Sequence, residues 1–577
     1  MNQPTPAIVA QNAVRRLPRV ALLMLCAAYL MPGLLGRGPW KSADVTAFGY
    51  MAALAQNTAG IGRWFDPLLL GLRPETPALL PYWLGAWAIQ LAPWLRPDLA
   101  VRIVFALMLW GTFTATWYAV YYLARTPRAQ PVAFAFGGEA RPTDYARAMA
   151  DGGLLALIAS LGLAQLGHET TPALAQLFFV ACLFYGVAAL PYRRTGPLVG
   201  LAVGSLGLAL SGAPSLGLAL GLGALWLALR EHRAAARDDS SDPAPTFGWP
   251  AIAGIALAVA IALVVAVALK QVHWRIALPG SHPGVSAWLD WRSLIKLFIW
   301  FTWPAWPLAV WTLWRWRRQL GARHVALPLW FMLVPVAATL LTDFADRSLL
   351  LALPALATLA AFALPTFRRS VSALIDWFTL LFFSGSAVLI WLYWIAMQTG
   401  TPPKMAASIA RLAPGHVAEF SPLVFVLAVL ATLVWCWLVR WRTGRHRAAL
   451  WKTLVLPAGG VTLCWMLLMT LWLPALDHAL SYAPQVRAIA QRTGPTRCVA
   501  ELGVGRAQIA ALRHHAGYDL QPINSHTPCD WLIVKPEVVS LLHHIVNLED
   551  WRLIGTFRRT TNPNDDLLLY QRAPAAQ

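Results

Sequence analysis

The sequence is poor in charged residues. Of its 577 residues, only 12% are Asp, Glu, Lys or Arg, whereas 58% are hydrophobic. A soluble chain of this length needs far more charge to keep its surface in water. The scarcity of charge excludes an ordinary soluble protein and favours one embedded in a membrane.

Recognisable catalytic motifs are also scarce. The sequence has six cysteines, and none of them forms a cluster with the spacing of metal ligands. A Walker phosphate loop, a Ser-His-Asp signature and an internal repeat are absent as well. Function must therefore be sought in dispersed residues.

Apolar runs of membrane-spanning length recur along the chain. Lipid offers backbone polar groups no partners, so each run is expected to be a helix. The fold class predicted is an all-α polytopic membrane protein of about thirteen helices. The spans are expected at 19–36, 100–124, 152–167, 172–190, 197–211, 214–229, 250–270, 294–314, 325–342, 348–365, 373–397, 421–439 and 453–475. The stretch 197–229 is either two helices or one long kinked helix.

Arginine residues give an independent test of this count, because cytoplasmic loops are enriched in Lys and Arg. Every second predicted loop is basic, as at Arg193 and Arg194 or at Arg368 and Arg369, and the loops between are nearly bare. This alternation puts the N-terminus in the cytoplasm and the last hundred residues in the periplasm, with the chain in the inner membrane. The net charge of +20 is dispersed over many short loops, which disfavours nucleic acid as a partner.

Two domains are expected, a transmembrane domain at 1–475 and a periplasmic α/β domain at 476–577. In the first, residues 37–99 form a periplasmic loop with amphipathic stretches at 42–56 and 79–95, which are typical of interfacial helices. In the second, strand-like runs at 497–501, 530–535, 551–558 and 565–571 alternate with helix-like runs at 505–514 and 536–546. Cys498 and Cys529 each begin a strand-like run, and an oxidising periplasm permits either a disulfide or two free thiols.

Charged residues are nearly missing from the interiors of the spans and gather at their external edge. A transporter is expected to hold its polar site near the membrane midplane. A site at the outer surface better suits an enzyme that acts on lipid-linked substrates. A diverged membrane scaffold and a flippase for lipid-linked sugars are the alternatives.

Short motifs at this edge resemble a known family. Residues 40–44 read Trp-Lys-Ser-Ala-Asp, and residues 66–77 read Asp-Pro-Leu-Leu-Leu-Gly-Leu-Arg-Pro-Glu-Thr-Pro, followed by Tyr82 and Trp83. Later, Arg347 precedes Leu349-Leu-Leu-Ala-Leu-Pro354. These segments resemble the membrane glycosyltransferases of the GT-C superfamily, especially the lipid A aminoarabinose transferase (ArnT) family and its protein-mannosyltransferase relatives. The resemblance, with the thirteen spans and the α/β tail, runs over nearly the whole chain.

The resemblance implies a glycosyltransferase that moves a sugar from a polyprenyl-phosphate donor to an envelope lipid or glycan, with membrane lipids around it. Asp44 is the implied catalytic residue, which accepts a proton from the acceptor or orients it; its alternative role is to favour the start of a helix. The residues implied to bind substrate are Arg63, Arg73, Glu75, Tyr82, His168, Glu169, Arg275 and Arg347. A divalent metal is the one candidate cofactor, with Glu75 and His273 as its ligands.

The sequence departs from the family pattern at several positions. Val45 replaces a glutamate, Thr76 replaces a lysine of the Glu-Lys-Pro turn, and Thr171 stands where an aspartate is expected. Residues 211–215 also lack the usual lysine. The loss of both lysines requires that arginines supply the positive charge for an anionic carrier.

Overall fold

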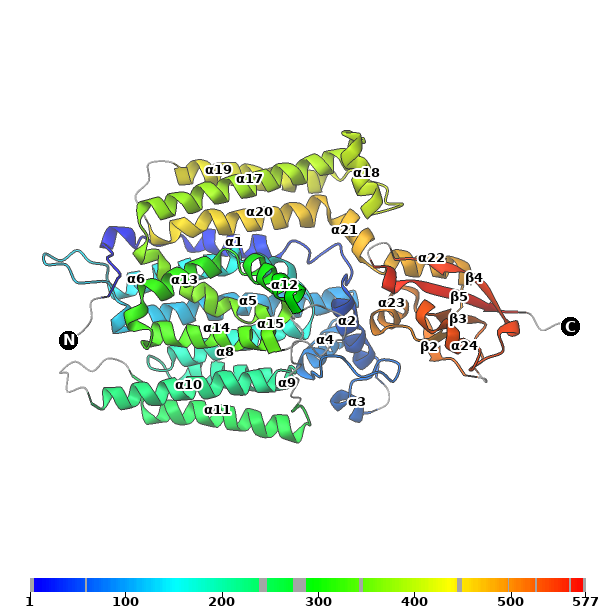
Figure 1. The fold of residues 1–577 in the computed structure, drawn as a ribbon, viewed down its shortest axis with the longest axis horizontal. Helices are drawn as coiled ribbons and strands as arrows, with labels where there is room; N and C mark the ends of the chain where they lie inside the picture. Colours follow the sequence, from blue (N-terminus) through cyan, green and yellow to red (C-terminus); the bar gives the residue numbers. More distant parts are fainter. Residues whose placement is uncertain are drawn as a thin grey trace. The chain divides into compact units, whose positions relative to one another are not determined.

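The computed structural model describes residues 5–57, 60–237, 246–272, 287–341, 346–443, 449–496, 498–524, 527–559 and 562–573. The chain forms two compact units (Figure 1). The first contains Met1–Pro32, Phe105–Ile390 and Leu423–Thr470, and the second contains Gly33–Val104, Trp391–Pro422 and Leu471–Gln577.

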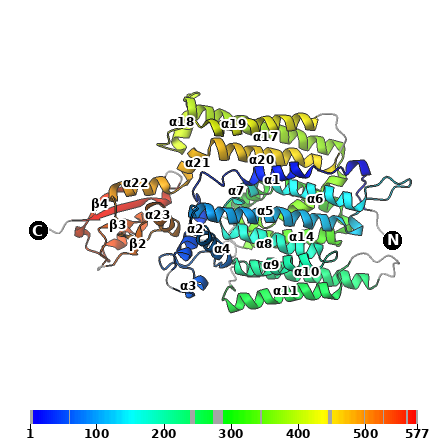
Figure 2. The same ribbon diagram turned by 180° about the vertical axis from the view of Figure 1, so that it is seen from behind.

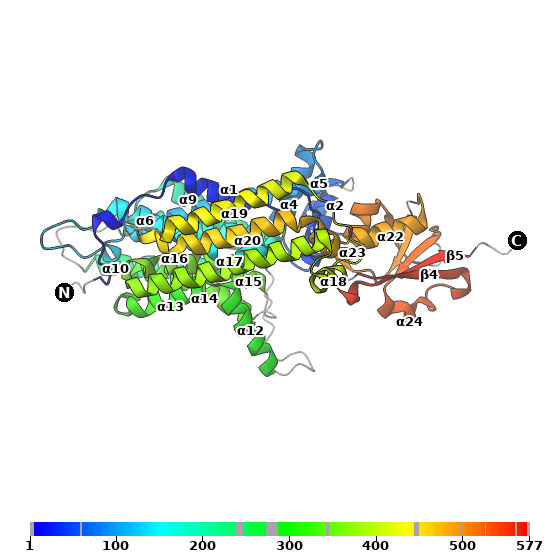
Figure 3. The same cartoon turned by 90° about the horizontal axis from the view of Figure 1, so that it is seen from above.

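The first unit is built from helices. They are α1 (Arg19–Leu30), most of α5 (Pro97–Ala124), α6 (Pro142–Ala159), α7 (Leu161–Leu166), α8 (Pro172–Ala189), α9 (Thr195–Leu210), α10 (Pro214–Ala235), α11 (Trp249–Ala268), α12 (Ala287–Phe301), α13 (Ala305–Arg315), α14 (Arg323–Leu341), α15 (Asp346–Leu350), α16 (Leu353–Ala363), most of α17 (Arg369–Thr399), α19 (Pro422–Thr443) and α20 (Val455–Leu471). Figures 1 and 3 show α17, α19 and α20 running side by side.

The polytopic prediction is confirmed. Among the described residues, seven helices are long and apolar enough to cross a membrane: Pro97–Ala124, Pro172–Ala189, Trp249–Ala268, Arg323–Leu341, Arg369–Thr399, Pro422–Thr443 and Leu450–Leu471. Three shorter apolar helices, Arg19–Leu30, Thr195–Leu210 and Leu353–Thr366, cover further predicted spans. All thirteen predicted ranges contain helix.

The stretch 197–229 forms two helices rather than one kinked helix. The helix α9 ends at Leu210, Gly212 has a positive φ of 81°, and Pro214 begins α10. A positive φ interrupts the helical backbone, and proline is favoured at the first position of a new helix. Helices α9, α10 and α11 then lie side by side (Figure 2).

Several predicted boundaries are wrong. The run 294–314 is divided at 302–304, where Pro304 lacks the N–H that a continuous helix needs, and α12 leaves the direction of α13 (Figure 3). The first span ends at Leu30 rather than 36, just before Pro32. Helix α6 begins at Pro142 rather than 152, because its first turns bury one face through Tyr145 and Met149 although their sequence is polar.

Small residues let neighbouring helices of the first unit approach closely. A Cβ atom on Gly204 of α9 would lie 2.6 Å from the backbone nitrogen of Leu183 on α8. A Cβ on Gly207 would lie 2.1 Å from the ring of Phe179. Glycine at such contacts is typical of helix packing in membranes, where dispersion rather than the hydrophobic effect holds helices together.

The second unit combines short helices with a sheet. Its helices are α2 (Ser42–Ala55), α3 (Gly62–Phe65), α4 (Leu80–Leu91), α18 (Pro403–Leu412), α21 (Leu473–Leu480), α22 (Ala483–Thr493), α23 (Arg506–Ala516) and α24 (Val539–Leu542). The helices predicted at 42–56 and 79–95 are confirmed as α2 and α4. Helix α2 packs against both α4 and α23, and a Cβ on Gly49 would lie 2.4 Å from the Cβ of Ala510.

The sheet has five strands in the order β2-β1-β3-β5-β4. They are β1 (Cys498–Leu502), β2 (Asp519–Pro522), β3 (Trp531–Val534), β4 (Trp551–Phe557) and β5 (Leu567–Arg572). Strand β1 pairs in parallel with β2 and β3, whereas β5 is antiparallel to β3 and β4. The four predicted strands and the small C-terminal α/β architecture are confirmed. The edge strand β2 was not predicted, because its sequence Asp-Leu-Gln-Pro has neither β-branched residues nor clear alternation.

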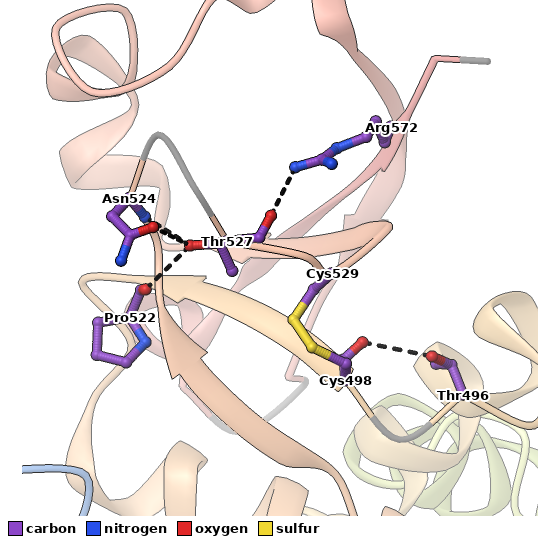
Figure 4. Close-up of a disulfide and its surroundings, with 7 residues drawn as sticks. All are labelled: Thr496, Cys498, Pro522, Asn524, Thr527, Cys529 and Arg572. Carbon is purple, nitrogen blue, oxygen red and sulfur yellow. Dashed lines mark hydrogen bonds between the residues drawn. A yellow bond between two sulfur atoms is a disulfide. The ribbon is translucent and has the colours of Figure 1, made fainter. Parts of the chain in front are cut away.

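A disulfide joins Cys498 of β1 to Cys529 just before β3 (Figure 4). Beside it, the Thr527 hydroxyl bonds the Asn524 side chain and backbone at 2.8 Å each, and Arg572 donates to the Thr527 carbonyl at 2.8 Å. The structure therefore contains the disulfide rather than two free thiols, and the bridge links the start of β1 to the segment just before β3.

Candidate functional site

Asp44 lies in the first turn of α2, and its side chain is buried. It is only 3% exposed, and its Oδ2 atom lies 3.4 Å from the backbone nitrogen of Trp40, which donates to it. Its place in the first turn, where a negative charge interacts favourably with the helix dipole, fits the alternative role that the sequence offered. Its burial also keeps it out of bulk water, which a proton-accepting or orienting role requires.

Three further charged residues of the second unit are buried in the same region: Arg37, Asp98 and Arg102. Arg102 donates to the Asp98 carboxylate and, at 2.7 Å, to the carbonyl of Leu34. Its guanidinium also interacts electrostatically with Arg37 and Asp44. Burying four charges is favourable only when they offset one another. We refer to Arg37, Asp44, Asp98 and Arg102 as the buried charge cluster.

The cluster was found by the structure and only in part by the sequence. Asp44 was predicted, but Arg37, Asp98 and Arg102 were not. One feature of the sequence could have identified two of them. Asp98 and Arg102 are four residues apart, a spacing that places both side chains on the same face of a helix.

The side chains of the buried charge cluster are suited to two chemical roles. The Asp44 oxygens are hydrogen-bond acceptors that can take or orient a proton of a substrate hydroxyl or amine. The guanidinium groups of Arg37 and Arg102 can stabilise negative charge that develops nearby. The Arg37 guanidinium also lies 4.8 Å from the ring centre of Trp40, a cation–π distance.

The remaining predicted residues of the second unit lie on the segment 63–82. Arg63 is exposed on α3, and Arg73 pairs with Asp66 at 3.1 Å. Tyr82 is buried and donates its hydroxyl to the carbonyl of Thr76 at 3.2 Å. Burial raises the pKa of Tyr82 well above its usual range, so the phenol stays neutral.

Glu75 has a partner that the sequence did not predict. Its carboxylate pairs with Arg506 of α23 at 3.3 Å, and the Arg506 Nε donates to the carbonyl of Arg73 at 2.8 Å. Arg506 therefore places a cation beside the turn in which Thr76 stands instead of a lysine. Sequence reasoning missed it because the two segments are 431 residues apart.

The described residues do not fit the predicted metal site. Glu75 is largely exposed, at 76%, and is engaged by Arg506. The second predicted ligand, His273, lies outside the described residues. Within the described part of the chain, no three His, Cys, Asp or Glu side chains are close enough together to hold a metal ion. No chemical step is therefore assigned to a metal.

The predicted residues of the first unit include a specific pair. Arg347 of α15 donates to Glu169 at 3.1 Å, and Glu169 is buried between α7 and α8. The two ring nitrogens of His168 each lie 3.0 Å from a backbone carbonyl, of Ala164 and of Tyr29, and its ring packs on Trp465. His168 thus has structural contacts, whereas Glu169 and Arg347 form an ion pair. Arg275 lies outside the described residues.

Comparisons with known proteins bear on the fold. No family model and no curated protein matches the sequence. The crystal structure of ArnT from Cupriavidus metallidurans bound to undecaprenyl phosphate is similar, with a TM-score of 0.61 and 14% identity over 96% of this chain and 98% of that one. The apo structure of the same protein gives a TM-score of 0.59 and 14% identity over 96% and 97%. Over almost its whole length the chain therefore has the polytopic membrane fold of ArnT, as the resemblance predicted.

Proposed function

We propose that this protein is a glycosyltransferase that moves a sugar from a polyprenyl-phosphate carrier to an envelope lipid or glycan. The observation that carries this proposal is the placement of Asp44. In a chain with the fold of a protein solved with undecaprenyl phosphate, the carboxylate singled out by the sequence is buried and interacts electrostatically with a buried arginine, Arg102.

In the proposed reaction, the acceptor hydroxyl or amine attacks the anomeric carbon of the donor sugar. The bond between that carbon and the phosphate oxygen breaks, and the carrier phosphate leaves as an anion. Asp44 takes the proton from the attacking group, a role worth about 10²–10⁴-fold in rate. Arg102, which interacts electrostatically with Asp44, stabilises the negative charge that develops on the departing phosphate.

The phosphate of the carrier is proposed to contact arginines outside the buried charge cluster. Arg63 and Arg73 belong to the same unit as Asp44. Arg506 supplies a cation beside the turn 73–76, where Thr76 stands in place of the lysine expected from the family pattern. Arginine suits a phosphate because its planar group can donate two parallel hydrogen bonds. Glu75, Tyr82, His168, Glu169, Arg275 and Arg347 remain proposed substrate contacts.

We further propose the inner membrane as the location, with a cytoplasmic N-terminus and a periplasmic domain at 476–577 beyond a transmembrane domain at 1–475. The alternation of basic loops supports this orientation. The Cys498–Cys529 disulfide supports an oxidising compartment for the C-terminal domain.

A transfer assay tests the proposal. The full-length protein, reconstituted in lipid nanodiscs, is incubated with undecaprenyl-phosphate donors carrying different labelled sugars and with an envelope lipid extract. Transfer of label to an acceptor, with release of undecaprenyl phosphate, supports the proposal. Binding of the carrier without transfer from any donor would favour the scaffold hypothesis, and movement of an intact donor across the bilayer would favour the flippase.

A further inference from the structure

Trp40, four residues before Asp44, is held by parts of the chain that lie far away in sequence. The residue is 7% exposed, and all three of its polar groups have partners. Its backbone N–H faces Asp44, its indole N–H donates to Asp477, and its carbonyl accepts from Arg559. Trp40 therefore connects Asp44 to two residues more than 430 positions later. All of them belong to the second unit.

Asp477 fixes the segment before Asp44 at two points. One of its carboxylate oxygens, Oδ1, accepts the indole N–H of Trp40 at 2.7 Å and the backbone N–H of Gly38 at 2.9 Å. Hydrogen bonds to a carboxylate are about twice as strong as those between neutral groups. Asp477 lies on α21, so the position of this helix determines where residues 38–40 can lie.

Arg559 holds the same residue from the C-terminal sheet domain. One of its Nη2 hydrogens is directed to the Trp40 carbonyl at 3.2 Å, and the same nitrogen lies 2.6 Å from the carbonyl of Leu480 on α21. Its Nη1 donates to Asp565 at 2.6 Å, and its guanidinium lies 3.7 Å from the ring centre of Tyr482. Arg559 is thus held by Leu480, Asp565 and Tyr482, and its hydrogen bond to Trp40 couples the position of Trp40 to that of the sheet domain.

We infer that Asp477 and Arg559 are positioning residues, which act through Trp40 to set the place of the Asp44 carboxylate. Neither residue touches a reacting atom in the proposed chemistry. Their effect is geometric, since a displacement of a catalytic group by about 1 Å can cost on the order of 10²-fold in rate. The C-terminal domain then serves transfer by completing the support of the first periplasmic loop. The catalytic part of this inference rests on the proposed function.

Four variants distinguish a loss of positioning of residues 38–48 from a general loss of folding. In Asp477→Asn, a carboxamide oxygen still accepts both hydrogen bonds, whereas Asp477→Leu has a similar volume and accepts neither. Arg559→Gln shortens the side chain and removes the guanidinium that donates to Trp40. The control is Glu537→Gln, which breaks the Lys535–Glu537 ion pair of the same domain, away from Trp40.

The experiment is hydrogen–deuterium exchange of the full-length protein in nanodiscs, followed in peptides that cover residues 38–48 and strand β3. We expect exchange at 38–48 to accelerate by roughly tenfold or more in Asp477→Leu and Arg559→Gln, with β3 unchanged. Asp477→Asn, which keeps weaker hydrogen bonds, is expected to accelerate exchange much less than Asp477→Leu, and Glu537→Gln is expected to match the wild type. With a donor that supports transfer, kcat is expected to fall by about 10–100-fold in the first two variants while the donor KM stays within about twofold.

The following exchange results would overturn the inference. Wild-type exchange at 38–48 in Asp477→Leu shows that Asp477 does not hold the segment, and equal acceleration in Asp477→Asn shows that its hydrogen bonds are not the reason. Acceleration in β3 as well shows a general loss of folding. If the exchange results are as expected but even the wild type transfers no sugar, the proposed function fails, whereas the control of Trp40 by Asp477 and Arg559 stands.

Discussion

Arg347 donates a hydrogen bond to Glu169 at 3.1 Å, although the two residues are 178 positions apart. The Glu169 side chain is 5% exposed, and that of Arg347 is 34% exposed. The sequence indicated each as a substrate contact but did not predict that they pair.

Breaking this pair from one side should cost more than removing both charges. Arg347→Gln leaves the buried Glu169 without this ion pair, and we expect it to destabilise the protein by about 1–3 kcal/mol. The double variant Arg347→Gln/Glu169→Gln should be less destabilised than the sum of the single variants. Thermal unfolding of all four proteins in one detergent measures the coupling, and strict additivity would show that the ion pair contributes nothing.

The disulfide should stabilise the sheet domain. Cys498 and Cys529 close a loop with a sequence separation of 31, for which chain entropy gives about 3–4 kcal/mol. Dithiothreitol is therefore expected to lower the melting temperature of the wild type but not that of Cys498→Ala/Cys529→Ala. Cys436→Ser, which changes an exposed free cysteine, is the control and should retain the sensitivity. Insensitivity of the wild type would argue against the bridge.

Stability should fall in mild acid through His515 of α23. Burial is the largest cause that lowers its pKa, followed by the neighbouring His514, and the value moves from the usual 6.5 to about 4. Asp477 and Asp98 raise the pKa and Arg487 lowers it, by smaller amounts. Between pH 6.5 and about 4 the unfolded chain binds a proton that the folded chain does not, so the free energy of unfolding decreases as the pH falls.

The measurement compares the wild type with His515→Gln at about pH 7.5 and about pH 5, either side of the usual histidine pKa. The melting temperature of the wild type should drop further than that of the variant over this interval. Equal drops in the two proteins would mean that His515 titrates with the same pKa in the folded and unfolded states.

The contact between α2 and α23 should tolerate no larger side chain at Gly49. A Cβ there would lie 2.4 Å from the Cβ of Ala510, so Gly49→Val must separate the helices and should cost about 1–3 kcal/mol. Gly555→Ala, where no heavy atom lies within 4 Å of the added Cβ, is the matched control. Thermal unfolding measures the stability of both variants. Gly49→Ala should also lose stability, and the second substitution Ala510→Gly should recover part of that loss.

The sequence predicted the helices well because lipid imposes a simple rule, a long apolar run for each crossing. It placed α9 and α10, α2 and α4, and four of the five strands. It failed where local geometry decides, as at Pro304, and where a polar segment buries one face, as in the first turns of α6. The edge strand β2 was missed because its pairing with β1, not its own composition, makes it a strand.

The candidate site was predictable only in its single residues. Asp44, Glu169 and Arg347 were each named from the sequence, but the sequence did not predict that Glu169 and Arg347 pair across 178 positions. Asp477, Arg506 and Arg559 stand in no recognisable motif, because their roles come from contacts with segments far away in the sequence. Tertiary contacts select these residues, and hydropathy and spacing contain no information on such contacts.

The central claim is that the Asp44 carboxylate takes part in sugar transfer. The decisive measurement is the single-turnover rate of transfer by wild type and Asp44→Asn, with Asp519→Asn, an exposed carboxylate of β2, as the control. Asp44→Asn keeps an acceptor oxygen for the Trp40 N–H but cannot take a proton, so the rate should fall by about 10²–10⁴-fold while Asp519→Asn matches the wild type. An undiminished rate in Asp44→Asn would contradict the account.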